Sequence, residues 1–225
     1  MRLRAAGSGL VLATLMLGAV PAAQGQAQDD CVPIVDLAKD PVGTFPADWK
    51  VRKDEGKSVY SIREENGKHV LHAASKGLGI QAAFEHEWDL DTYPILAWSW
   101  RSLVFPTGAD ERKSSTNDSV LAVYLLVPYS RIRGPKAVKY IWSERVPIGT
   151  PLSSNGGLTQ VVVLRTGTDK LGQWVDERVD ARADYKRLFG ESDTPKPAGI
   201  AVLTDSDDTK SSAEGEYANF RVCRK

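Results

Sequence analysis

This chain has few cysteines and histidines, and its positive and negative side chains balance. Its 225 residues include 2 cysteines and 3 histidines, and its formal net charge is 0. A balanced charge gives no sign of a nucleic-acid or anionic-membrane partner, which would favour a basic face. The sequence also lacks the short motifs of phosphate-binding loops, dinucleotide folds, serine hydrolases and zinc proteases. The sequence therefore shows no motif of these common enzyme classes.

Long apolar runs are missing as well. The longest, residues 9–20, has 12 residues, whereas a transmembrane helix needs about 20. It follows the basic start MRLR and precedes the small residues of PAAQGQA, an order typical of secretory signal peptides. We expect a signal peptide over residues 1–27, cleaved between 22 and 27, with a buried N-terminal helix as the alternative. The expected location is the periplasm or the exterior, and no transmembrane segment would remain.

The two cysteines stand near opposite ends of the expected mature chain, residues 28–225. Export would place Cys31 and Cys223 in an oxidising compartment. One disulfide between them is the natural interpretation, and two unrelated free thiols are the alternative. Neither has a histidine close by in the sequence, which argues against a catalytic role.

Short segments rich in β-branched and aromatic residues fill most of the mature chain. Glycine, proline, asparagine or aspartate bounds each of them, which predicts about nine strands. Asn66-Gly67 suits the turn of a hairpin within 58–75. The other expected strands are 78–88, 93–103, 119–130, 137–144, 158–167, 198–205 and 215–223. The pattern predicts an all-β fold: one antiparallel β-sandwich domain over residues 28–225.

One segment has helical rather than strand periodicity. Residues 178–192 are charged, and Ala181, Tyr185 and Leu188 recur at helical spacing. Asp180 can cap the start and Gly190 the end, so we expect one short amphipathic helix. The longest irregular stretch, 105–118, is either a solvated loop or a functional one.

Three aspartates fall within the stretch TDSDDT, residues 204–209. A phosphatase nucleophile is excluded because too little chain follows to build the rest of that fold. An EF-hand is excluded because Lys210 stands where its loop needs glycine. Asp205 and Asp207 could still hold a structural calcium ion in another type of loop. The alternative is an acidic turn whose side chains cap backbone amides.

The tryptophans are the second set of candidates. Trp98 and Trp100 share one strand face, a spacing that favours the core over a binding surface. Exposed aromatics would, however, suit stacking on sugar rings, so Trp100 and Trp142 are candidate ligand-contacting residues. Arg101 points to the opposite face and could pair with Asp118. The candidate binding residues are thus Trp100, Arg101, Asp118, Trp142, Asp205 and Asp207.

Several segments together resemble DUF3047, a family of exported bacterial proteins of unknown function. The resemblance rests on 93–101, 117–127, 139–144, 183–191, 199–209 and 214–222, in that order. It implies a jelly-roll, galactose-binding-like sandwich, a fold that includes carbohydrate-binding modules. Calcium often occupies a structural site in such folds. Fold alone does not fix function.

Three functions are compatible with the sequence. The first is an exported, non-catalytic binding protein with a glycan as ligand, which predicts that Trp100 or Trp142 is exposed beside a polar cleft. The second is a cell-envelope module that binds another protein through an exposed apolar patch. The third is a glycan hydrolase or lyase that uses converging carboxylates such as Asp118 with Asp205 or Asp207.

Overall fold

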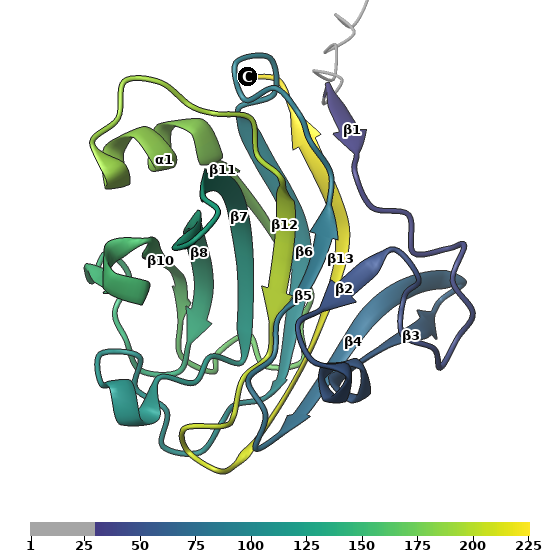
Figure 1. Cartoon of the computed structure of the whole chain (residues 1–225). Helices are drawn as coiled ribbons and strands as arrows, with labels where there is room; N and C mark the ends of the chain where they lie inside the picture. The colour runs from purple at the N-terminus through teal and green to yellow at the C-terminus, as the bar shows by residue number, and fades with distance from the viewer. Residues whose placement is uncertain (1–29) are drawn as a thin grey trace, which may run out of the picture.

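Two β-sheets packed face to face make up the computed structural model, which describes residues 30–225 (Figure 1). The expected signal peptide lies outside the described residues. In residues 30–225 no helix is long and apolar enough to cross a bilayer.

Sheet A has the strand order β11-β6-β13-β4-β3, with β1 added on β13, and all its pairings are antiparallel. Its strands are β1 (Cys31–Pro33), β3 (Tyr60–Glu65), β4 (Lys68–Lys76), β6 (Ile95–Val104), β11 (Val175–Asp180) and β13 (Ser212–Cys223). Asn66 and Gly67 both have positive φ, so the expected hairpin turn between β3 and β4 is confirmed.

Sheet B has the order β2-β5-β12-β7-β8-β10-β9. Its strands are β2 (Trp49–Val51), β5 (Ala82–Glu85), β7 (Leu121–Ser130), β8 (Gly134–Ser143), β9 (Leu152–Ser154), β10 (Thr159–Thr166) and β12 (Gly199–Leu203). The pair β8–β10 is parallel, which differs from the expected all-antiparallel pairing. The connection 144–158 crosses from one end of β8 back to the other, and a parallel pair requires such a crossover.

The all-β, jelly-roll sandwich expected from the sequence is confirmed. Residues 30–225 contain one α-helix, α1 (Ala181–Phe189), which joins β11 to β12, and Figure 1 shows it lying across one end of the sandwich. Asp180 accepts a hydrogen bond from the Ala183 amide, and Gly190 ends the helix with left-handed φ, as predicted. Three short 3₁₀ helices complete the described elements: η1 (Asp54–Val59), η2 (Ser114–Thr116) and η3 (Asn155–Gly157).

The core lies between the sheets and is aromatic at its centre. From sheet A, Trp98 and Trp100 face Tyr140 and Trp142 of sheet B. The ring centroids of Trp98 and Tyr140 are 5.6 Å apart, and those of Trp100 and Trp142 are 6.1 Å apart. Each such ring removes about 150–250 Å² from water, so these four side chains anchor the packing of the two sheets.

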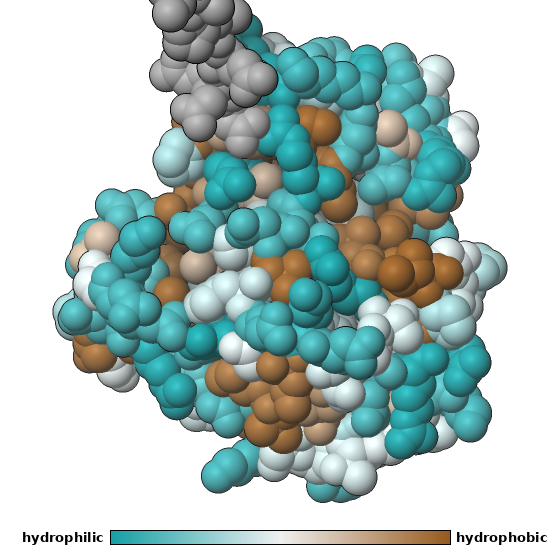
Figure 2. Space-filling view, turned by 180° about the vertical axis from the view of Figure 1, so that it is seen from behind, coloured by the Kyte–Doolittle hydropathy of each residue, from teal (hydrophilic) through white to brown (hydrophobic). Residues whose placement is uncertain are grey.

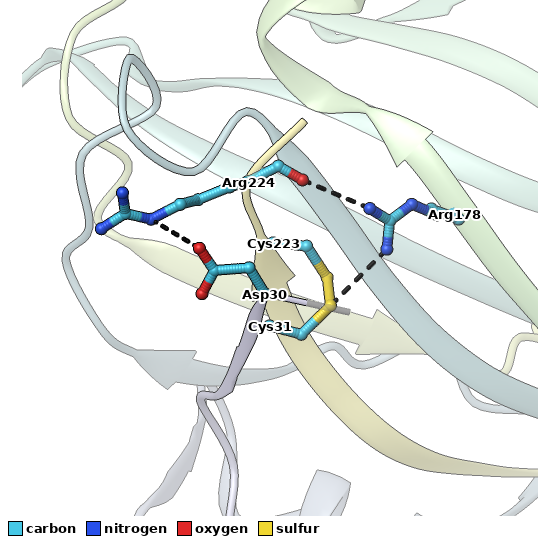
Figure 3. Close-up of a disulfide and its surroundings, with 5 residues drawn as sticks. All are labelled: Asp30, Cys31, Arg178, Cys223 and Arg224. Atoms are coloured by element: carbon cyan, nitrogen blue, oxygen red, sulfur yellow. Dashed lines mark hydrogen bonds and ion pairs between the residues drawn. A yellow bond between two sulfur atoms is a disulfide. The ribbon is translucent and has the colours of Figure 1, made fainter. Parts of the chain in front are cut away.

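A disulfide joins the first described strand to the last. Cys31 and Cys223 are bonded, which confirms the predicted pairing and excludes two free thiols. Arg178 of β11 lies against the bond, with its guanidinium 3.5 Å from Cys31 Sγ (Figure 3). The pairing of β1 with β13 is thus fixed covalently at its end.

Candidate functional site

The structure separates the predicted site residues into three places. Trp100 and Trp142 lie in the core, Arg101 lies on the outer face of sheet A, and the aspartates gather at one end of sheet B. They do not form one site.

The prediction that Trp100 or Trp142 is exposed beside a cleft is wrong. Their exposed fractions are 0% and 1%. Their polar ring atoms are also satisfied internally, since Trp100 Nε1 donates to Glu177 and Trp142 Nε1 donates to the Gly167 carbonyl. The shared strand face indicated a core role correctly, and neither ring can stack on a ligand.

The predicted pairing of Arg101 with Asp118 is also wrong. Arg101 Nε donates to Glu216 Oε2 at 2.7 Å, and Nη1 donates to Glu65 Oε1 at 2.9 Å. Glu216 is buried, and burial alone would raise its pKa. Contacts with the His72 imidazole and the Arg101 guanidinium outweigh that effect and lower the pKa of Glu216. Arg101 is therefore the centre of an ionic network on sheet A.

This network holds a tryptophan that the sequence reasoning did not select. The Arg101 guanidinium lies over the ring of Trp174, 4.8 Å from its centroid, and Trp174 Nε1 donates to Glu65 Oε2 at 2.8 Å. Trp174 is half-buried, whereas the other five tryptophans are buried. Two contacts thus fix the orientation of an aromatic ring on the molecular surface.

Small side chains beside Trp174 leave a trough across the outer face of sheet A. Ala218 of β13 pairs with Ser99 of β6, and Ser99 pairs with Asp176 of β11. Val70 of β4 continues the floor. These side chains are short, while Arg101 and Glu216, two residues along the same strands and on the same face, are long and charged. The difference in side-chain size produces the hollow.

The hollow is a cleft of two adjoining compartments. The Trp compartment, of about 350 Å³, is lined by Glu65, Asn66, Val70, Ser99, Trp174, Asp176 and Ala218. The arm compartment, of about 430 Å³, lies under the segment that follows β1 and is lined by Val35, Asp36, Leu37, Ala38, Phe220 and Arg221. Lys68, His69 and Asn219 line both. Each volume lies in the range of known ligand sites.

One sequence signal could have identified the Trp compartment. Trp174 follows Leu171-Gly172-Gln173, an exposed turn between two strands, and turns of this kind lie at the surface. The remaining lining residues come from five strands and one loop, and only the register of sheet A brings them together.

The aspartate cluster (Asp118, Asp205 and Asp207) lies elsewhere, where β12 ends and β7 begins. Antiparallel pairing of these strands brings the two positions together. One carboxylate oxygen from each lies within 4.8 Å of the others. A Cβ at Gly79 would come within 2.5 Å of Asp207 and 2.7 Å of Asp205, so only glycine fits beside them.

Asp118 organises the connector between β12 and β13. It accepts hydrogen bonds from the amides of Asp208 and Thr209, at 3.1 and 2.8 Å, and from the Thr209 hydroxyl at 2.5 Å. The turn amides are thus capped by a carboxylate, as expected for an acidic turn. The carboxylate, however, comes from Asp118, which is distant in sequence, and not from the turn itself.

Burial controls the charge of the cluster. Asp205 is buried, and burial together with a hydrogen bond to Asp207 raises its pKa to about 9, against the attraction of the Lys139 ammonium. Burial also raises the pKa of Glu111, which lies near Lys139. Asp118 and Asp205 are too buried for a substrate to reach, so the geometry supports a structural role over the acid-dependent catalysis considered above.

Apolar surface is the feature that a protein-binding module would need. On the face seen in Figure 2, apolar side chains occur in several patches separated by hydrophilic ones. That face has no single continuous apolar area.

A model of the family described as "Protein of unknown function (DUF3047)" matches residues 47–221 and confirms the resemblance. A comparison with curated proteins finds no match.

Among solved structures, the chain is similar to a family 11 carbohydrate-binding module of the cellulosomal cellulase Lic26A-Cel5E of Clostridium thermocellum. The identity is 9% and the TM-score 0.45, over 87% of this chain and 95% of that chain. It is also similar to endoglucanase 3 of Trichoderma harzianum, from family GH12, at 12% identity and a TM-score of 0.42, over 90% and 100%. The xyloglucanase domain of NopAA from Sinorhizobium fredii has 13% identity and a TM-score of 0.38, over 80% and 99%. Sequence identity and TM-score are both so low that neither a ligand nor a reaction is inferred for this chain from these proteins.

Proposed function

The chain belongs to the DUF3047 family, whose function is unknown, and we propose from its own geometry that it is an exported, non-catalytic carbohydrate-binding protein. The observation that carries this proposal is Trp174, an oriented aromatic ring in a polar cleft. A sugar ring has an apolar face that packs on an aromatic side chain and hydroxyls that need hydrogen-bond partners. The Trp compartment offers both.

The polar groups around Trp174 suit hydroxyls in number and kind. Asn66 and Asn219 each line the Trp compartment with an amide, which both donates and accepts. Asp176 accepts from Ser99 at 2.5 Å and keeps further acceptor capacity. Both Glu65 oxygens already accept hydrogen bonds, from Arg101 and Trp174, so Glu65 is a positioning residue rather than a free acid or base.

Titration calorimetry with a panel of soluble oligosaccharides tests this proposal. We expect at least one oligosaccharide to bind and Trp174→Ala to weaken that binding at least tenfold, about 1.4 kcal/mol. Tyr129→Ala is the matched control, because Tyr129 is an exposed aromatic on the β7–β8 hairpin of the other sheet. Absence of binding across the panel, or equal affinity of the Trp174 variant, would overturn the proposal.

We also propose that the aspartate cluster holds a structural Ca²⁺. Its donors are all carboxylate oxygens, which Ca²⁺ prefers and softer metals do not. Asp205 and Asp207 would supply the free oxygens, since Asp118 already caps the connector. We expect CaCl₂ to raise the melting temperature and EDTA to lower it. The Asp207→Asn variant should respond less, and a melting temperature indifferent to both reagents would exclude the ion.

A further inference from the structure

The two compartments of the cleft differ in charge. In the Trp compartment the acidic side chains are Glu65 and Asp176, and the cationic one is Lys68, which lines both compartments. In the arm compartment the basic side chains are Lys68 and Arg221, with Asp36 as the acidic one. The Asp36 carboxylate accepts a hydrogen bond from the Ala38 amide at 3.0 Å and keeps its charge, so the arm compartment has two cationic side chains against one anionic one.

Lys68 and Arg221 keep their donors available. In the described part of the chain neither side chain forms an ion pair, in contrast to Arg101, which is paired with two glutamates. Arg221 is half-buried on β13 and Lys68 is exposed on β4. Two unpaired cations beside a hollow attract an anionic group, and a guanidinium binds carboxylate, sulfate or phosphate oxygens in pairs.

The wall that closes the arm compartment is held in place from both ends. The Ile34 amide donates to the Phe220 carbonyl at 3.0 Å, and His69 Nδ1 lies 3.1 Å from the Leu37 carbonyl. The disulfide fixes the strand from which this segment continues. The compartment is therefore a built hollow.

We propose that the ligand is an acidic oligosaccharide that spans both compartments. A sugar ring packs on Trp174, and an anionic substituent of a neighbouring sugar binds to Lys68 and Arg221. The shared chemistry is a carboxylate, sulfate or phosphate group on a sugar. This inference rests on the proposed carbohydrate-binding function and adds a class of ligand and an orientation to it.

Three oligosaccharides of equal length test the inference: a neutral one, a uronic-acid one and a sulfated one. We expect at least one acidic oligosaccharide to bind at least tenfold more tightly than the neutral one, with an affinity that falls as salt rises from 50 to 300 mM, at which surface charges are screened. The double variant Lys68→Gln/Arg221→Gln should remove this preference. Lys76→Gln is the control, because Lys76 is exposed on β4 and lines neither compartment.

The outcomes separate this inference from the proposed function. If the neutral oligosaccharide binds as tightly as the acidic ones, or the preference survives in the double variant, the acidic-ligand inference is wrong while carbohydrate binding stands. If no oligosaccharide binds, or if Trp174→Ala leaves the affinity unchanged, the proposed function itself is wrong. If the sulfated and uronic ligands differ, the tighter one identifies the anionic group.

Discussion

At the scale of single residues, Asp205 shows how burial can keep a carboxyl group protonated and therefore neutral. Its neighbours Asp118 and Asp207 are acidic, and the Lys139 ammonium opposes their effect. Several carboxylates with little solvent around them cannot all stay ionised without a compensating charge. A shared proton and a bound cation are the two ways of supplying it.

In metal-free buffer with EDTA, this proton makes stability depend on pH. The folded-state pKa of Asp205, about 9, lies above the usual value of 3.8. Between these values the folded state holds a proton that the unfolded state has lost, so the contribution is full below about pH 4 and disappears as pH rises through 9. Melting temperatures measured from pH 5 to 9 should therefore fall, and Asp205→Asn should flatten the fall. Asp169→Asn, at an exposed position, should not change the slope.

Gly79 is a second residue whose role is set by its surroundings. Gly79→Ala would force a methyl group against the carboxylates of Asp205 and Asp207. Overpacking of this kind costs about 1–3 kcal/mol, so chemical denaturation should show a lower free energy of unfolding. Adding Asp207→Ala should recover part of the loss, since it removes the nearest atom. If Asp207→Ala instead lowers the free energy of unfolding of the Gly79→Ala variant further, this explanation is wrong.

At the scale of elements, the sequence predicted the strands that carry long apolar or aromatic patterns. It missed β11, whose residues are mostly charged, and β1, β2 and β9, which have three residues each and are too short to show a pattern. β11 reads Val-Asp-Glu-Arg-Val-Asp and was included partly in the expected helix. Its two valines alone do not reveal a strand, and pairing with β6 is what makes it extended. The aspartate cluster was predicted in part because Asp205 and Asp207 are neighbours in sequence. The cleft was not, because its residues meet only through sheet register.

The start of α1 offers a test of an element boundary. Asp180 both caps the helix and pairs with Lys225 at 2.7 Å. Asp180→Ala should lower the free energy of unfolding by about 1 kcal/mol through loss of the cap. Asp180→Asn keeps a capping oxygen, so its free energy of unfolding, measured by urea denaturation, should fall by less. Equal losses for the two variants would mean that the ion pair, and not the cap, stabilises this end.

At the scale of the whole molecule, the disulfide joins positions 192 residues apart. In the chain-entropy model, closing so long a loop stabilises the fold by up to roughly 5 kcal/mol. The double variant Cys31→Ser/Cys223→Ser should therefore unfold at a markedly lower urea concentration. Both cysteines are replaced because a single remaining thiol would allow disulfide-linked dimers to form. An unchanged midpoint would show that closing this loop contributes little to the stability of the fold.

The uneven burial of the tryptophans has a practical consequence for the whole molecule. Five of the six indoles are shielded by the protein, and Trp174 is the one that lines the cleft. Iodide, which quenches only the fluorescence of rings it can touch, would therefore report on a single position. A ligand seated on Trp174 should reduce that quenching without any label, so the molecule carries an optical reporter at the place where its occupancy matters.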